Sequence, residues 1–160
     1  DLIIQKATEL GAHRVVPVLS ERSVPDWDEA KAAAKVEKWR SVCIESIKQC
    51  GSAWLPTLEM PMTPSAAIED ARGAEVSLIA TLQSDAKHPR MHIDGYEAEN
   101  GQAPKKLAIW VGPEGDYTPA EINQIRGSAL PITLGPLVLR SETAAIYCLA
   151  FLNYELQSRP

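Results

Sequence analysis

The stretch that decides the fold is LGPLVLRSETAA, residues 134–145. It continues a short apolar run, residues 131–134, which is predicted to be a strand, and it passes through a Gly-Pro break and an apolar loop into a helix. Four polar residues stand together where this helix starts, namely Arg140, Ser141, Glu142 and Thr143. A strand that opens into such a loop predicts a ligand crevice at the carboxyl end of a parallel sheet.

A second strand end repeats this pattern upstream. Residues 106–111 are predicted to be a strand, and they lead into the tetrapeptide GPEG, residues 112–115. Taken alone, the tetrapeptide is equally typical of an ordinary turn. Likewise, Arg140 with Glu142 is typical of an exposed ion pair at a helix start, and Arg22 of a solvated loop residue. The two strand ends together favour a binding site.

Strands that alternate with helices predict an α/β fold with a mainly parallel sheet. Two helices have the clearest signals. The helix expected over residues 29–50 has apolar residues at helical spacing and ends at Gly51. The other helix starts with the capping box TPAE, residues 118–121. Helices are expected over residues 2–10, 29–50, 64–71, 119–126 and 142–157, strands over residues 15–19, 76–82, 106–111 and 131–134, and loops over residues 20–29 and 83–104.

The last helix has an unusual pattern. Residues 144–151 are apolar on all faces, which predicts that this part of the helix is buried all round. In a chain of 160 residues, such burial indicates packing against another subunit as well as against the domain itself.

Composition limits the class of protein. With 45% hydrophobic and 23% charged residues, the chain is typical of one soluble domain, and it has neither an apolar run of membrane-spanning length nor a signal peptide pattern. Its net charge of -5 disfavours nucleic-acid binding through the bulk charge, so any basic contact must be local or come from a partner subunit or another domain. Cys43, Cys50 and Cys148 lack metal-ligand spacing and are expected to be buried or half-buried thiols in a reducing cytoplasm.

The usual nucleotide and hydrolase signatures, GxGxxG, Walker A, HExxH and GxSxG, are absent. Instead, five motifs in order resemble the RsmE-type ribosomal RNA methyltransferases of the SPOUT superfamily. These motifs are QKATELG at residues 5–11, SERS at 20–23, QCG at 49–51, VGPEG at 111–115 and the stretch at 134–145. The resemblance spans nearly the whole chain.

This resemblance implies a SPOUT-type α/β fold with a C-terminal trefoil knot, a homodimer, and S-adenosylmethionine (SAM) as the cofactor, without a metal. The implied reaction is methylation of N3 of one uridine in the ribosomal RNA of the small subunit. The cofactor would lie on three strand-end segments, whose residues include Thr81, Leu82, Val111, Gly112, Glu114, Gly115, Leu134, Gly135, Leu137, Leu139, Thr143 and Ala144.

The implied chemistry also assigns catalytic candidates. Uridine N3 must lose its proton before or during attack, and a nearby cation favours the anionic base. Arg140 and Arg22 are the candidates for this cation, and Glu142 is the candidate for the proton acceptor or for an orienting residue.

The chain differs from the usual family pattern in several ways. Family members usually carry an N-terminal PUA-like RNA-binding barrel and a first strand, so residues 1–160 are expected to be a SPOUT domain fragment without both. Asp116 stands where a third glycine is frequent, and Leu137 stands where arginine is common. Two alternatives remain: another SPOUT enzyme that modifies transfer RNA or a ribose 2′-hydroxyl, and an inactive knotted RNA-binding or assembly module.

Overall fold

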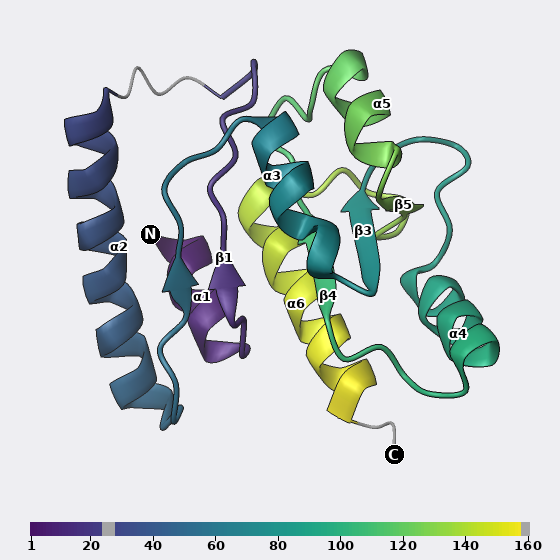
Figure 1. The fold of residues 1–160 in the computed structure, drawn as a ribbon, viewed down its shortest axis with the longest axis horizontal. Coiled ribbons are helices and arrows are strands. Elements are labelled where there is room, and N and C mark those ends of the chain that lie inside the picture. The colour runs from purple at the N-terminus through teal and green to yellow at the C-terminus, as the bar shows by residue number, and fades with distance from the viewer. Residues whose placement is uncertain (24–27, 158–160) are drawn as a thin grey trace.

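The computed structural model describes residues 1–23 and 28–157 and shows a mixed α/β architecture (Figure 1). The middle of the predicted 20–29 loop lies outside these residues. In chain order the elements are α1 (Leu2–Glu9), β1 (Arg14–Val15), α2 (Glu29–Cys50), β2 (Thr57–Leu58), α3 (Pro64–Asp70), a 3-10 turn (Ala71–Gly73), β3 (Val76–Ala80), α4 (Pro89–Asn100), β4 (Leu107–Trp110), α5 (Pro119–Arg126), β5 (Leu130–Ile132) and α6 (Ser141–Gln157).

All the strand pairs are parallel, which confirms the predicted α/β class. β3 lies between β4 and β5, while β1 pairs with β2 in a second, two-stranded sheet. In the larger sheet Ile79 stands opposite both Trp110 and Pro131. Because parallel strands share a direction, the segments that follow β3, β4 and β5 all leave from one edge of this sheet.

Helices cover both faces of the three-stranded sheet. The side chain of Ile79 packs with residues of α3 and α5, whereas its neighbour Leu78 packs with residues of α4 and α6. Both side chains are completely buried. Burial of both faces explains why the strand sequence VSLIA is nearly all apolar instead of alternating. Each such side chain contributes roughly 1.5–3 kcal/mol through its burial.

The longest helix, α2, has clear limits in the sequence. The Asp28 side chain accepts a hydrogen bond from the Lys31 N–H at its start, and Gly51 ends it in the left-handed conformation with φ 73°. The sulfur of its buried Cys43 accepts a hydrogen bond from the hydroxyl of Thr8, in α1, at 3.3 Å. Figure 1 shows that α2 and the β1–β2 pair lie to one side of the three-stranded sheet.

Some predictions are wrong. Residues 83–104 contain α4 instead of a continuous loop, and the strand expected at 15–19 is reduced to β1 with an isolated bridge from Val18 to Met62. Cys50 is exposed, while Cys43 and Cys148 are buried as expected. Tyr147 of α6 is 46% exposed in the single chain, so burial of this helix on all faces stays a prediction that requires a second subunit.

Candidate functional site

Three segments meet at the carboxyl edge of the sheet: residues 81–83 after β3, 111–117 after β4 and 133–140 after β5. The first segment is bonded to the end of β5, since the buried Thr81 donates its N–H to the Ile132 carbonyl at 3.1 Å. Large apolar side chains stand exposed on these segments, with exposed fractions of 65% for Leu82, 72% for Leu137 and 77% for Val138. Such exposure of apolar side chains is typical of a surface that binds a ligand or a partner.

The segment after β4 forms a tight turn, as one reading of GPEG predicted. The Asp116 N–H donates to the Pro113 carbonyl at 2.8 Å, and Asp116 adopts a positive φ of 59°. Aspartate tolerates this conformation better than most residues, which explains how it stands where the family often has glycine. Gly112 lies close to the turn, because an added Cβ would lie 2.7 Å from Oδ1 of Asp116 and 3.2 Å from the backbone nitrogen of Tyr117.

The start of α6 is joined to this turn by Ser141. Its hydroxyl donates to the Gly112 carbonyl at 2.9 Å, so the segments after β4 and β5 are directly bonded. Arg140 next to it is exposed, and its guanidinium has no hydrogen-bond or ion-pair partner among the described residues, while its carbonyl accepts from the Ala144 N–H in the first turn of α6. The surface ion pair between Arg140 and Glu142 is therefore not formed.

Glu142 is half-buried, and its position contrasts with that of Arg140. Its Oε2 atom is inaccessible to solvent and has no hydrogen-bond partner among the described residues. An unpaired buried acceptor costs about 1–3 kcal/mol, so this oxygen is available for a donor. The next two residues differ: Thr143 is exposed, whereas Ala144 is buried in the helix packing.

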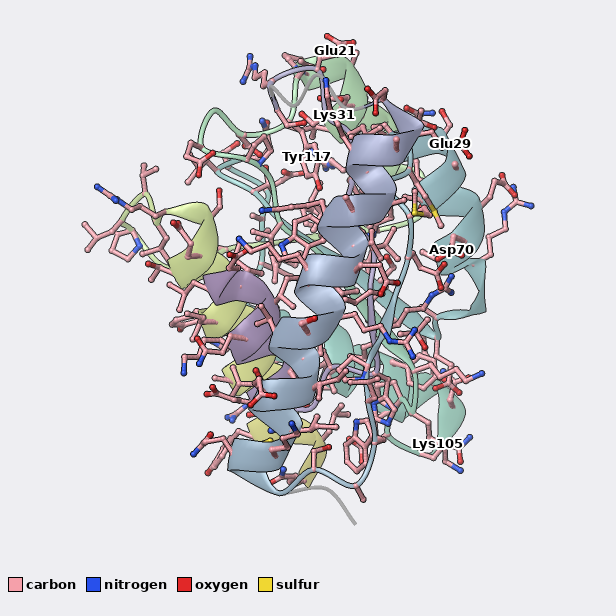
Figure 2. All side chains as sticks on the ribbon, turned by 90° about the vertical axis from the view of Figure 1, so that its left-hand side faces the viewer. Glu21, Glu29, Lys31, Asp70, Lys105 and Tyr117 are labelled. Carbon is pink, nitrogen blue, oxygen red and sulfur yellow. The ribbon has the colours of Figure 1, made fainter. Side chains whose placement is uncertain are left out.

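Arg22 reaches the same turn from a distant part of the chain. Its Nη1 donates to the Gly115 carbonyl and, at 3.5 Å, to the Tyr117 carbonyl. It is therefore bound to the turn and is not a freely solvated loop residue. Figure 2 shows the neighbouring Glu21 and Tyr117 at the same end of the molecule, with Lys105, which precedes β4, at the opposite end.

A buried carboxylate holds the loop that carries Arg22. Glu121 Oε1 accepts from the Glu21 N–H at 2.9 Å, and Oε2 accepts from the Thr118 N–H at 2.8 Å and the Ser20 hydroxyl at 3.4 Å. Burial raises the pKa of Glu121, but these hydrogen bonds outweigh the effect of burial and hold its pKa below the ordinary value. Glu121 therefore stays ionised and keeps accepting from both segments.

Tyr117 closes the turn from inside. It is only 3% exposed, and its hydroxyl donates to the Val111 carbonyl at 3.2 Å. Burial raises the pKa of this phenol far above its ordinary value, and the charges of Glu121 and Asp116 raise it further. The phenol therefore remains a neutral hydrogen-bond donor.

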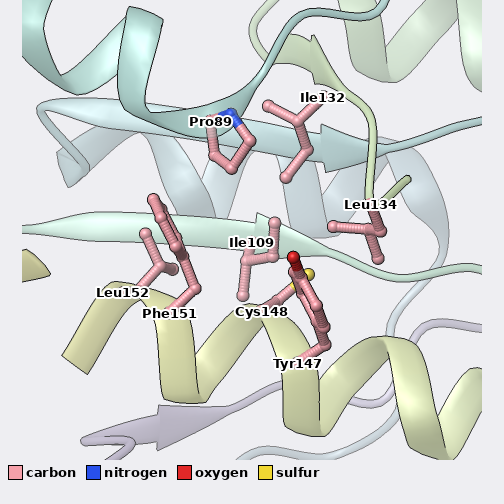
Figure 3. Close-up of a pocket in the computed structure, with 8 residues that line it drawn as sticks. All are labelled: Pro89, Ile109, Ile132, Leu134, Tyr147, Cys148, Phe151 and Leu152. Atoms are coloured by element: carbon pink, nitrogen blue, oxygen red, sulfur yellow. The ribbon is translucent and has the colours of Figure 1, made fainter. Parts of the chain in front are cut away.

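The small pocket in Figure 3 is not the site formed by these segments. It lies between the sheet, the start of α4 and α6, and it has no room for even one water molecule. Ligand pockets usually measure about 300–1,000 Å³, so this space is too small for a nucleoside. Leu134, predicted as a cofactor wall, lines this pocket together with Cys148, whose pKa burial raises to about 12.

The structure adds three residues to those predicted for the site. Ser141, Tyr117 and Glu121 each bond a part of the turn or of the loop that holds it. Ser141 stood among the four polar residues at the start of the last predicted helix, and Glu121 had a sequence signal as the last residue of the capping box, which the structure confirms. Its second role, toward residues 20 and 21, depends on a contact across 100 residues of sequence that no local pattern reveals.

In the part of the chain that the structure describes, no group of three or more histidine, cysteine or acidic side chains is placed to hold a metal ion. No helix within the same ranges is long and apolar enough to cross a membrane.

Comparison with known proteins identifies the family. Residues 1–153 match the sequence model described as an RNA methyltransferase domain, and the chain belongs to this family. It is 31% identical over 158 residues to ribosomal RNA small subunit methyltransferase E of Bacillus subtilis. That match covers 97% of this chain but 60% of the relative, so the chain spans about three fifths of the relative's length.

Solved structures agree with this family. A protein of Legionella pneumophila, whose structure contains the bound cofactor SAM, has a TM-score of 0.85 and 32% identity, covering 96% of this chain and 60% of its own. The ribosomal RNA small subunit methyltransferase E of Neisseria gonorrhoeae, at 24% identity over 96% of this chain and 60% of its own, shares the fold with a TM-score of 0.80. These similarities confirm the α/β fold expected of an RsmE-type domain.

Proposed function

We propose that this chain is the catalytic domain of a SAM-dependent methyltransferase that methylates N3 of a uridine in small-subunit ribosomal RNA. The family match and the relative from Bacillus subtilis support the activity on ribosomal RNA. The observation that carries the proposal is the meeting of three strand-end segments at one edge of the sheet, in a fold shared with a SAM-bound protein at 32% identity.

The residues present suit such a cofactor. Among the described residues, the N–H groups of Leu82, Leu137 and Leu139 have no protein acceptor, so they are free to bind the polar edge of an adenine. The exposed side chains of Leu82 and Leu137 provide apolar surface beside them. This combination of apolar walls and a few placed polar groups is what small-molecule sites require. The proposed cofactor residues otherwise remain those expected from the sequence.

SAM would supply a methyl group that is already activated by its sulfonium, so the protein's task is to prepare the nucleophile. A cation next to uridine N3 lowers the cost of removing its proton. Arg140 suits this role better than Arg22, because the Arg22 guanidinium already binds the carbonyls of Gly115 and Tyr117. Glu142 carries an unpaired buried oxygen that can orient a donor or accept the proton.

The remaining expectations belong to the same proposal. We propose that α6 contributes to a homodimer, since its middle is apolar and its Tyr147 and Tyr154 side chains are 46% and 69% exposed. A trefoil knot would be formed by the segments after β4 and β5. Because the net charge is -5, the basic surface for RNA would come from the partner subunit or from a PUA-like domain of a longer, cytoplasmic protein.

Titration calorimetry with S-adenosylhomocysteine tests the cofactor site first. The proposal expects micromolar binding at one site per chain. Methyl transfer from labelled SAM to unmethylated small ribosomal subunits, followed by nucleoside analysis, then tests the reaction with the longer protein. Methyl on N3 of uridine supports the proposal, whereas methyl on a ribose 2′-oxygen indicates another SPOUT enzyme. Binding without transfer to any RNA indicates an inactive module.

Arg140→Ala separates catalysis from binding. We expect kcat/KM to fall about 100-fold, the lower end of the effect of a group that assists proton transfer. The matched control is Arg72→Ala, because Arg72 is exposed, pairs with Glu69, and lies in the 3-10 turn before β3, whereas the site lies after the strands. If Arg140→Ala leaves both SAM affinity and methyl transfer intact, the role assigned to Arg140 is wrong.

A further inference from the structure

The turn after β4 has nearly all of its carbonyl groups bonded. The Val111 carbonyl accepts from the Tyr117 hydroxyl, the Gly112 carbonyl from Ser141, and the Pro113 carbonyl from the Asp116 N–H. The Gly115 carbonyl accepts from Arg22. These donors come from the turn itself, from α6 and from the loop after β1, so the turn is held from several directions.

The hydrogen bond from Ser141 is made to the Gly112–Pro113 peptide, where the backbone of the turn has the most conformational freedom. Gly112 has more backbone freedom than any other residue type would have, while the ring of Pro113 fixes its own φ. The peptide between them has no N–H, so its carbonyl is its only hydrogen-bonding group. Bonding that carbonyl to the Ser141 hydroxyl at 2.9 Å sets the orientation of the whole peptide plane.

Ordinary helix capping does not account for this contact. A serine that caps a helix accepts a hydrogen bond from an N–H one turn later, at the N2 or N3 position. Ser141 is the first residue of α6, and its hydroxyl instead donates outside the helix to a residue 29 positions earlier. The contact therefore serves the turn.

We infer that Ser141 is a positioning residue, whose hydroxyl holds the Gly112–Pro113 peptide and couples the two segments that form the proposed cofactor site. This inference rests on the proposed function for its effect on SAM, but the coupling itself is a property of the protein alone. Ser141 keeps the turn in its binding conformation before the cofactor arrives, which lowers the entropic cost of binding.

Amide hydrogen exchange of the unliganded protein tests the coupling. In Ser141→Ala we expect the amides of Asp116 and Tyr117, which donate to the Pro113 carbonyl and to Asp116 Oδ1, to exchange about fivefold faster, as loss of one hydrogen bond predicts. Ser141→Thr keeps a hydroxyl and is expected to restore slow exchange. Ser41→Ala is the matched control, because it removes a serine hydroxyl that donates to the Glu37 carbonyl within α2, far from the turn.

The effect on the cofactor is measured separately. We expect Ser141→Ala to weaken S-adenosylhomocysteine binding and to raise the KM for SAM about fivefold, while kcat stays near the wild-type value and Ser141→Thr binds normally. Unchanged exchange of the Asp116 and Tyr117 amides in Ser141→Ala would overturn the inference, as would a Thr variant that behaves like the Ala variant. If the wild-type protein binds no S-adenosylhomocysteine, the proposed function fails, yet the exchange experiment still decides the coupling.

Discussion

Replacing Glu121 with glutamine removes a buried charge that joins α5 to the loop of residues 20–23. Oε1 accepts from Glu21 and Oε2 from Thr118, so the NH₂ group of a glutamine would face a backbone N–H in either orientation. One charge-assisted hydrogen bond, worth about 1.5–3 kcal/mol, is lost, and a buried donor is left without an acceptor. We expect Glu121→Gln to lower the free energy of unfolding by about 3 kcal/mol at pH 7.

This loss should depend on pH in a defined direction. Hydrogen bonds hold the pKa of Glu121 in the folded protein below its value in the unfolded chain, in spite of the opposing effect of burial. The stabilisation is therefore fully present above the unfolded pKa, near 4.3, and is lost as pH falls through the folded pKa. Glutamine does not titrate, so the difference in stability between wild type and Glu121→Gln should shrink below about pH 4.3.

Urea and thermal unfolding between pH 3 and pH 8 measure this difference. At pH 7 a loss of about 3 kcal/mol corresponds to a fall in Tm of roughly 6–12 °C for a chain of this size. Glu99→Gln serves as the control, because Glu99 is exposed on α4 and should change stability by less than about 0.5 kcal/mol. A loss below about 1 kcal/mol at pH 7, or a loss that is equal at all pH values, would refute the reasoning.

Three other predictions concern packing, the turn and the thiols. Leu78→Ala, in the centre of the sheet, should lower stability by about 2–5 kcal/mol in urea unfolding, and a smaller effect would contradict its complete burial. Gly112→Ala would place a Cβ 2.7 Å from Asp116 Oδ1 and 3.2 Å from the Tyr117 backbone nitrogen, so the turn must shift and S-adenosylhomocysteine binding should weaken in calorimetry, whereas Gly73→Ala, in open space, should leave it unchanged. Cys50 should react readily with a thiol reagent in the native protein, and protection of Cys50 comparable to that of the two buried cysteines would show that its exposed position is wrong.

Elements with complete local signals could be predicted from the sequence. The 29–50 helix has an apolar stripe and a terminal glycine, and the helix after Thr118 has a capping box with proline at its first position. For both helices, the structure confirms the predicted bounds and the predicted end signal, Gly51 in one and the capping box in the other. The meeting of the two Gly-Pro segments could also be predicted, because the parallel strands expected of an α/β fold end at the same edge of the sheet.

Helix α4 was missed because its apolar signal is sparse. Only Pro89 and Ile93 are buried in it, and Gly95 in its middle lowers helix propensity. Its end signals were nevertheless present, since His88 caps the first turn, Pro89 stands at the first position, and Gly101 closes it in the left-handed conformation. A prediction based on these end signals, instead of on apolar spacing, would have placed a helix here.

The supports of the candidate site could not be predicted for a different reason. Arg22 and Gly115 are 93 residues apart, and Ser141 and Gly112 are 29 residues apart. Such pairs depend on how helices and strands pack, which local patterns do not encode. Since donors from before and after it in the chain hold the turn, its conformation is complete only when α6 and the loop after β1 have both docked. The order of the site is therefore a consequence of the tertiary fold, which explains why a turn built on glycine can be rigid enough to position a ligand.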